Sequence, residues 1–264
     1  ARRQGRRGGG PVTDGKPLAV VVGAGPGLGI ALVRRFARAG MAVGFMARRP
    51  EAIAAYQAEL DAEDLDTKGF VADAGDPQAV SRVFAELRAS HGAAELLVYN
   101  AAIIEPSRFV TPSGIAEAQY SSAPGWKAHG EPVGVDYLMA SFRTNVAGAL
   151  HAAQQVAPAM IARGRGTILL TGGVLAFGPW IEWGTVSLGK AALRSLGHSL
   201  FKELTPLGVQ VATVAIHGTM AKGTAYDHDT VADAYWRLHR RPEAEWEPDF
   251  HFKAEPDDGA DPDA

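Results

Sequence analysis

Short apolar runs rich in β-branched residues recur along the chain, and each is followed by a longer segment with helical periodicity. In the first such segment, Leu28, Leu32, Val33 and Phe36 share one helical face. The runs predict strands at 18–25, 41–47, 68–73, 95–102, 166–173 and 209–218, and a seventh strand at 249–253. The segments between them predict further helices at 51–64, around 80–87, and at 136–162, 185–204 and 230–239.

Continuously apolar strands are typical of a parallel sheet that is buried on both faces. Alternation of strands and helices implies right-handed crossovers, which place helices on both sides of such a sheet. We therefore predict a single-domain α/β fold over residues 17–254, with a doubly wound, Rossmann-like parallel β-sheet. In this fold the ligand binds at the carboxyl ends of the strands. Residues 103–135 contain several prolines and glycines and are predicted to form an inserted loop.

The two ends of the chain carry opposite charges, although the net charge of the 264 residues is only −3. Residues 1–16 hold five basic side chains and one acidic, whereas residues 255–264 hold five acidic side chains and no basic one. Both ends are poor in large apolar residues, so we expect a disordered basic tail and a disordered acidic tail. The body of the chain has no excess of basic residues, which favours a solvated end over a nucleic-acid-binding arm.

Composition also limits the compartment and the partners. The apolar runs are shorter than the roughly 18 residues that a membrane span needs. The chain has no cysteine, which excludes disulfides and thiolate metal sites and agrees with a reducing cytoplasm. No apolar segment follows the N-terminal charges, so we expect no signal peptide. We expect a cytoplasmic protein that binds a small molecule and has no metal, membrane or nucleic acid as partner.

A glycine-rich loop stands between the first strand and the first helix, in VVGAGPGLGI. Gly23, Gly27 and Gly29 have the spacing G-x-x-x-G-x-G, whereas the spacing G-x-G-x-x-G fails at Leu28. Glycine permits the positive-φ turn and the close backbone approach of a pyrophosphate bound at a helix N-terminus. We therefore assign this loop to a dinucleotide, with Pro26 and Leu28 among the contacting residues.

The second strand ends in ARRPE, so arginines stand where a carboxylate would accept the hydroxyls of an adenine ribose. Arg48 and Arg49 can instead pair with a 2′-phosphate, which favours NADP(H) over NAD(H) as the cofactor. A solvated pair of arginines at the start of a helix is the alternative.

Taken in order, these pieces resemble the short-chain dehydrogenase/reductase family over residues 18–253. The matching features are the glycine loop at 23–29, Asp73 after the third strand, YNAA at 99–102, Asn145, Lys190, and HGT at 217–219. The resemblance implies hydride transfer between a nicotinamide and a carbonyl compound or an alcohol.

The resemblance also assigns residues to the parts of the nucleotide. The assigned residues are Asp73 and Ala74 at the adenine, Asn100 and Ala101 at the ribose, and Gly218 and Thr219 beside the nicotinamide. By the same resemblance, Lys190 holds the hydroxyls of the nicotinamide ribose and Asn145 anchors a kink or a water in the long helix. The alternatives are a solvated helix lysine and a helix-bending asparagine.

Two residues depart from the family's pattern around the reacting oxygen. The family's tyrosine stands four residues before the lysine, whose charge lowers the pKa of the phenol, and here that residue is Val186. The family's serine, thirteen residues before the tyrosine, is replaced by Gly173, and the proline before Gly218 is replaced by His217. None of the six tyrosines falls within 138–225, so no neighbouring position supplies the phenol.

Losing a positioned general acid costs about 10²–10⁴-fold in rate, while cofactor and substrate positioning persist. We take His217, at the end of the sixth strand, as the substitute proton donor, because imidazole titrates near neutral pH. A histidine with a structural hydrogen bond is the alternative. The weaker candidates are Thr171, Glu182, Thr185 and Ser187. Gly172 and Gly173 are expected to let a larger ligand approach the backbone.

Two functions stay open. The first is an NADP(H)-dependent oxidoreductase for a small or medium apolar carbonyl compound or alcohol, with a non-standard proton donor. The second is a non-catalytic NADP(H)-binding sensor or scaffold. The glycine loop and the arginine pair argue against a reaction without cofactor.

The substrate side carries two further expectations. Residues 103–135 are expected to cover the site, with Trp180 and Trp183 lining an apolar pocket; a surface insertion or an oligomer contact is the alternative. Relatives pair through the helices that correspond to 136–162 and 185–204, so we expect a homodimer or homotetramer.

Overall fold

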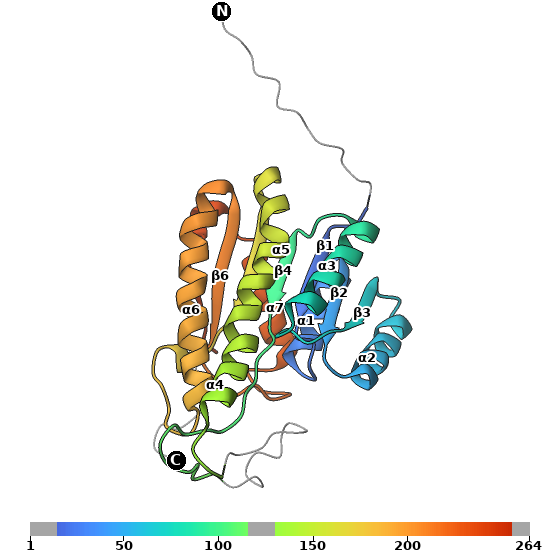
Figure 1. Cartoon of the computed structure of the whole chain (residues 1–264). Helices are drawn as coiled ribbons and strands as arrows, with labels where there is room; N and C mark the ends of the chain where they lie inside the picture. The colour runs from blue at the N-terminus through green and yellow to red at the C-terminus, as the bar shows by residue number, and fades with distance from the viewer. Residues whose placement is uncertain (1–14, 116–129, 255–264) are drawn as a thin grey trace, which may run out of the picture.

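The computed structural model describes residues 15–115 and 130–254, and its centre is a sheet of seven parallel strands (Figure 1). The strand order is β3-β2-β1-β4-β5-β6-β7. The order reverses between β1 and β4, and sheets of this kind bind ligands outside the carboxyl ends of the strands at that point. The predicted single-domain α/β fold with a doubly wound parallel sheet is confirmed. Residues 1–14 of the predicted basic tail, the predicted acidic tail and residues 116–129 of the insertion lie outside the described residues.

The elements follow the predicted order with shorter strands. The strands are β1 Leu18–Val22, β2 Ala42–Ala47, β3 Thr67–Val71, β4 Leu96–Tyr99, β5 Gly166–Thr171, β6 Val209–Ile216 and β7 Asp249–Phe252. The helices are α1 Leu28–Arg38, α2 Pro50–Ala62, α3 Pro77–His91, α4 Val135–Phe142, α5 Gly148–Arg163, α6 Gly184–Leu204 and α7 His228–His239. The first strand ends at Val22 rather than at residue 25, because Gly23 adopts a φ of 95° and turns the chain.

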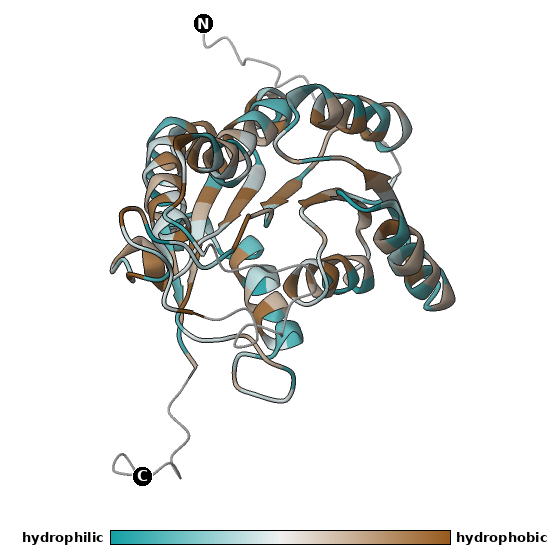
Figure 2. Cartoon of the chain, turned by 60° about the horizontal axis from the view of Figure 1, so that its bottom comes forward, coloured by the Kyte–Doolittle hydropathy of each residue, from teal (hydrophilic) through white to brown (hydrophobic). Residues whose placement is uncertain are grey.

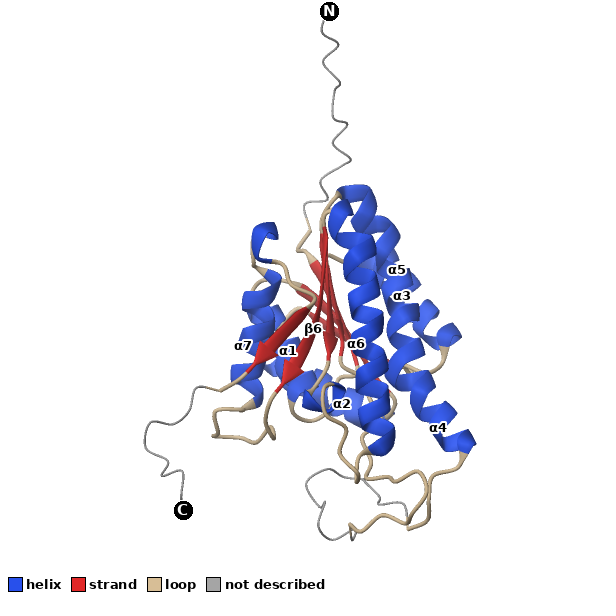
Figure 3. Cartoon of the chain, turned by 90° about the vertical axis from the view of Figure 1, so that its left-hand side faces the viewer, coloured by secondary structure: helices blue, strands red, loops and turns tan. Residues whose placement is uncertain are grey.

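Helices cover both faces of the sheet and create two cores (Figure 3). Successive residues of a strand point to opposite faces, so Val20 packs beneath α3, α5 and α6 while Val21 packs beneath α1 and α7. Figure 2 turns the carboxyl edge of the sheet forward and shows hydrophobic residues along the strands, between the two helical layers. No helix in the described part of the chain is long and apolar enough to cross a bilayer.

The long helix predicted at 136–162 is present, but a π-helical turn at Arg143–Ala147 separates α4 from α5. A π turn shifts backbone carbonyls out of the usual hydrogen-bond ladder. The carbonyl of Thr144 accepts a hydrogen bond from the buried hydroxyl of Tyr99 at the end of β4. A Cβ at Gly148 would overlap with this hydroxyl and with the carbonyl of Ala74. The helix therefore lies directly against the carboxyl edge of the sheet.

Candidate active site

The glycine loop between β1 and α1 leaves the N-terminus of α1 without a side-chain cap. Gly23 and Gly27 have φ angles of 95° and 113°, which side chains of L-residues rarely allow. A Cβ at Gly23 would also overlap with the backbone of Ala101. The first turn of α1 contains no acidic residue, so its backbone N–H groups can receive an anion. Within that turn the side chain of Leu28 is buried, whereas Pro26 in the loop is exposed.

Aspartates cap two other helices, α3 on one face of the sheet and α7 on the other. Asp76 accepts hydrogen bonds from the N–H groups of Gln78 and Ala79 at the start of α3. Asp227 accepts one from the N–H of Asp229 at the start of α7. A carboxylate cap occupies the N–H groups that an anionic ligand would use. Among α1, α3 and α7, only α1 is left for a phosphate.

Asn100 and Asp73 fix the loops that flank the glycine loop. The Nδ2 atom of Asn100 donates to the carbonyl oxygen of Gly23 over 2.8 Å. The exposed carboxylate of Asp73 accepts a hydrogen bond of 2.8 Å from the N–H of Gly75, while Ala74 is buried. The structure therefore brings Asp73, Asn100 and the glycine loop to one edge of the sheet.

Arg48 and Arg49 lie at the end of β2, and both are exposed. Arg49 precedes the first turn of α2, and its Nε atom is 3.9 Å from the carboxylate of Glu51. The guanidinium of Arg48 makes no hydrogen bond or ion pair with any residue that the structure describes. Arg48 is thus the less engaged of the two cations.

Lys190 extends from α6 to the end of β5. Its Nζ atom donates to the carbonyl oxygen of Thr171 over 2.6 Å, and burial lowers the pKa of Lys190 to about 8. The hydroxyl of Thr171 accepts a hydrogen bond of 2.8 Å from the fully buried Tyr235, which belongs to α7 on the other face of the sheet. Thr171 is therefore held by both helical layers, by α6 through its carbonyl and by α7 through its hydroxyl.

Asn145 lies in the π turn and connects the long helix to the segment after β4. Its Oδ1 atom accepts from the N–H of Ile103 over 2.6 Å, and its Nδ2 atom donates to the carbonyl of the same residue over 3.2 Å. A Cβ at Gly189, the neighbour of Lys190 in α6, would lie 3.1 Å from Nδ2 of Asn145. Asn145 is close to the lysine along α6, but no hydrogen bond joins the two in the described structure.

The described part of the insertion lies across the start of α6. The N–H of Ser107 donates to the carbonyl of Glu182 over 2.7 Å, and the N–H of Gly184 donates to the carbonyl of Ser107 over 2.9 Å. The hydroxyls of Ser107 and Thr185 are 2.7 Å apart, and both residues are buried. Thr185 is thus part of the contact that holds the insertion, and the expectation that it serves as a proton donor is not supported by its position.

Glu182 forms an ion pair with Arg108, and its carboxylate also accepts a hydrogen bond of 2.8 Å from the hydroxyl of Ser113. The hydrogen bond from Arg108 is the main reason that the pKa of Glu182 is lowered. A carboxylate that stays ionised cannot donate a proton, so the expectation for Glu182 is corrected. The pair instead fastens residues 108–113 to the start of α6.

Val186 and Gly173, which replace the family's tyrosine and serine, lie in different surroundings. Val186 is buried, with 2% of its surface exposed. A Cβ at Gly173 would meet no atom within 4 Å, whereas one at Gly172 would lie 2.7 Å from Thr213. The expectation that both glycines admit a ligand is therefore wrong for Gly172, because β6 packs against it. Ser187 accepts a hydrogen bond from the backbone N–H of Trp180.

The two tryptophans expected to line a pocket differ in exposure. Trp183 is buried beside the insertion, and Trp180 is 55% exposed. Exposed apolar side chains are common in the insertion at 109–110 and in the segment 174–181 that precedes α6. They are Phe109, Val110, Val174, Phe177, Trp180 and Ile181.

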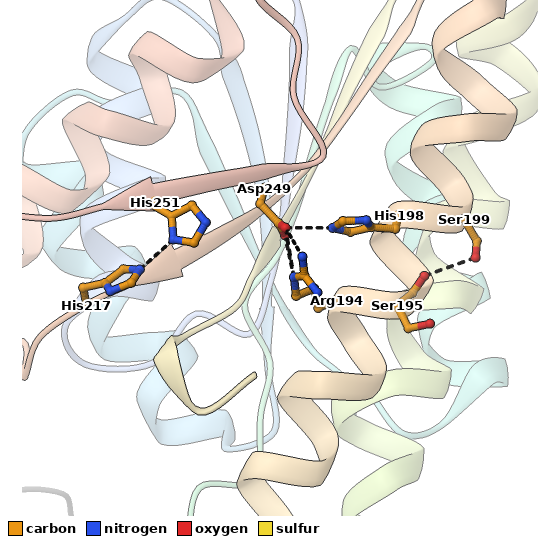
Figure 4. Close-up of polar contacts among 7 residues, drawn as sticks. All are labelled: Arg194, Ser195, His198, Ser199, His217, Asp249 and His251. Carbon is orange, nitrogen blue, oxygen red and sulfur yellow. Dashed lines mark hydrogen bonds and ion pairs between the residues drawn. The ribbon is translucent and has the colours of Figure 1, made fainter. Parts of the chain in front are cut away.

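His217 turns its ring toward β7, where its Nε2 atom lies 2.7 Å from Nδ1 of His251 (Figure 4). Burial lowers the pKa of His217, and the charges of His251 and Lys253 add to this effect. Beside this pair, Asp249 of β7 binds Arg194 and His198 of α6. No hydrogen bond joins His217 to Lys190 in the described residues, and no three histidine or acidic side chains there are grouped to hold a metal.

Gly218 and Thr219 follow His217 and are exposed. A Cβ at Gly218 would overlap with the ring of Tyr226, which therefore covers one side of this glycine. The sequence pattern does not mark Tyr226, Tyr235 or Ser107 as residues of the site. Tyr235 and Ser107 form hydrogen bonds with residues that lie 64 and 78 positions away in the sequence, so no local spacing predicts these contacts. The one signal in the sequence was the apolar period of α7, which marks Tyr235 as buried.

Comparison with known proteins identifies the family of the chain. A family model described as short chain dehydrogenase matches residues 17–231. Dehydrogenase/reductase SDR family member 4 of Sus scrofa is 29% identical over 204 residues, which cover 76% of this chain and 66% of that protein. Oxidoreductase asL5 of Sarocladium schorii is 28% identical over 196 residues, which cover 73% of this chain and 68% of that protein. This chain therefore spans about two thirds of the length of these relatives.

Solved structures show the same fold. A metagenomic short-chain oxidoreductase in complex with NADP matches with a TM-score of 0.72 and 22% identity, covering 89% of this chain and 96% of that one. A short-chain dehydrogenase from Rhodopseudomonas palustris matches with a TM-score of 0.71 and 20% identity, covering 90% of this chain and 98% of that one.

Proposed function

The chain belongs to the short-chain dehydrogenase family, and from that premise we propose that it is an NADP(H)-dependent oxidoreductase. Its substrate is a small or medium apolar carbonyl compound or alcohol. The observation that carries the proposal is the uncapped N-terminus of α1, which lies beside a positive-φ glycine loop that Asn100 holds in place.

The residues present fit a phosphorylated dinucleotide. Gly23 and Gly27 add no side chain of their own to the phosphate loop, and the N–H groups at the start of α1 would bind the diphosphate. Arg48 and Arg49 bind the 2′-phosphate, because a guanidinium matches phosphate oxygens bidentately. Lys190 holds the nicotinamide ribose by turning its Nζ atom from the carbonyl of Thr171. When bound, NADP(H) supplies or accepts the hydride.

The remaining contacts follow from the family. Asp73 and Ala74 bracket the adenine, Asn100 and Ala101 line the adjoining ribose, and Gly218 and Thr219 lie beside the nicotinamide. The exposed apolar side chains on 174–181, which follow Gly173 in the chain, and those on 109–110 in the insertion support an apolar substrate. On this proposal, residues 103–135 cover the substrate.

The proton transfer is the unusual part of the proposal, because Val186 and Gly173 stand where the family has its tyrosine and serine. His217 is the proposed replacement. Its lowered pKa keeps the imidazole neutral near pH 7, so it accepts a proton more readily than it donates one. This favours alcohol oxidation as the direction in which His217 assists, with His251 as the neighbour that receives or returns the proton.

One observation favours a second candidate, a non-catalytic NADP(H)-binding sensor or scaffold. Lys190, Asn145 and His217 each form hydrogen bonds to other groups, and none of these bonds joins one of the three to another. Val186 buries hydrocarbon on the α6 face of Lys190. A sensor needs nucleotide binding and does not need an assembled proton relay.

Fluorescence titration of the full chain with NADPH and NADH tests the proposal. We expect NADPH to bind more tightly, and we expect Arg48→Ala to weaken NADPH about tenfold while leaving NADH unchanged, because one charge-assisted phosphate contact is lost. Absence of binding to either nucleotide would refute the proposed function. Turnover of a panel of apolar ketones and alcohols then separates the two candidates: tight binding without turnover supports the sensor.

A further inference from the structure

The start of α7 lies beside the start of α1. The two helices are parallel neighbours, since Arg35 pairs with Asp233 and the rings of Phe36 and Trp236 are 6.3 Å apart. Only residues 217–227 connect β6 to α7, so α7 begins close to the carboxyl edge of the sheet. Both helix N-termini therefore point toward the same edge as the glycine loop.

His228, the first residue of α7, places its ring against this loop. A Cβ at Gly27 would lie 2.7 Å from Nε2 of His228, 3.0 Å from Cδ2 and 3.3 Å from Cε1. The edge of the imidazole thus contacts Gly27, whose φ of 113° already requires glycine. Any side chain at position 27 would push the ring away.

The ring nitrogens of His228 are not used by the described part of the chain. They make no hydrogen bond or ion pair with a residue that the structure describes, although the ring is half-buried. The adjacent Asp227 is engaged elsewhere, because its carboxylate accepts from the N–H groups of Gly223, over 2.6 Å, and Asp229, over 3.0 Å. Among the described residues, the ring of His228 therefore has no hydrogen-bond partner beside the uncapped end of α1, and it interacts with Asp227 only through charge.

We propose that His228 is a ligand of the cofactor's diphosphate, acting from α7 while the N–H groups of α1 act from the other side. This inference rests on the proposed function and adds a contact that the glycine loop alone does not supply. An N–H of imidazole donates to a phosphate oxygen, and a phosphate already held at a helix N-terminus strengthens that hydrogen bond. The contact concerns the diphosphate, so it is independent of the 2′-phosphate that Arg48 binds.

Two probes separate the diphosphate from the rest of the nucleotide. NADPH contains both the diphosphate and the 2′-phosphate, whereas adenosine 2′-monophosphate contains only the latter. We expect His228→Ala to weaken NADPH and NADH by the same factor, about tenfold, and to leave adenosine 2′-monophosphate unchanged in a displacement titration. His228→Gln keeps an N–H donor and should lose less. His91→Ala, at the carboxyl end of α3, is the matched control and should change none of the affinities.

The outcomes are distinct. If His228→Ala binds NADPH as tightly as the wild type or more tightly, the ring is a spacer or an obstacle and the inference is overturned. If the variant loses affinity for adenosine 2′-monophosphate by the same factor, the ring only stabilises the loop, and the inference is again overturned. A wild type that binds neither NADPH nor NADH instead refutes the proposed function, and this inference falls with it. Circular dichroism melting of each variant verifies that α7 is intact.

Discussion

The two halves of the carboxyl edge differ in how their polar groups are used. On the side of β1, β2 and β4, the N–H groups of Leu28 and Gly29 at the start of α1, and the side chains of Arg48 and His228, have no hydrogen-bond partner among the described residues. On the side of β5, α6 and β6, Lys190 and His217 each bind another group of the protein. The first half is thus arranged for a ligand, while the second is closed on itself.

This difference separates binding from chemistry. The proposed nucleotide binding depends on backbone geometry, in positive-φ glycines and an open helix end, which the sheet imposes. The reaction in this family depends on a few side chains, and replacing them leaves the fold unchanged. We call the side of β1, β2 and β4 the cofactor half, and the side of β5, α6 and β6 the reacting half. A chain can therefore keep the cofactor half while the reacting half diverges.

The largest expected effect comes from restoring hydroxyls to the reacting half. The double variant Val186→Tyr, Gly173→Ser adds a phenol one turn before Lys190 and a hydroxyl at a position with open space around it. Turnover of an apolar ketone with NADPH should rise about 10²–10⁴-fold, the usual contribution of a positioned general acid. Val186→Phe, Gly173→Ser has a ring of similar size without the phenol and should show no such rise. Unchanged turnover with intact NADPH binding would mean that the reacting half differs in more than these hydroxyls.

A smaller effect is expected from disturbing the cofactor half. Gly23→Ala forces a Cβ into the backbone of Ala101 at a φ of 95°. The free energy of unfolding in urea should fall by about 1–3 kcal/mol, and NADPH affinity should drop at least about tenfold. Gly25→Ala is the matched control, because its Cβ meets no atom within 4 Å and its φ is not positive. Equal behaviour of the two variants would contradict the geometry described for the loop.

The smallest effect concerns the charge of Lys190. Its pKa of about 8 in the folded chain lies below the value of about 10.4 in an unfolded one. Between these values the unfolded chain binds a proton that the folded chain does not, so stability of the wild type should rise as pH increases from 8 to 10.

The variant Lys190→Met removes this dependence. At pH 7 it should be more stable than the wild type by about 1–2 kcal/mol, because the cost of the buried charge exceeds the lost hydrogen bond to Thr171. The difference should shrink toward pH 10 in urea titrations. Leu188→Met, an exposed position on the same helix, is the control and should not change the pH dependence. The lowered pKa would be contradicted if the free energy of unfolding of both the wild type and Leu188→Met fell between pH 8 and pH 10.

The sequence by itself determined the order of strands and helices, the parallel sheet and the place of the glycine loop. These features depend on local periodicity and on residues with special backbone freedom, such as Gly23 and Gly27, which can be recognised without knowing their neighbours in space. The edge strand at Asp249–Phe252 was predicted for the same reason.

Only the tertiary structure decided which side chains meet. The pairing of Glu182 with Arg108, of Tyr235 with Thr171 and of His217 with His251 joins segments that lie far apart in the sequence. These contacts depend on how the loops at the carboxyl edge pack. Packing is fixed by many weak contacts at once, and no single spacing in the chain records it.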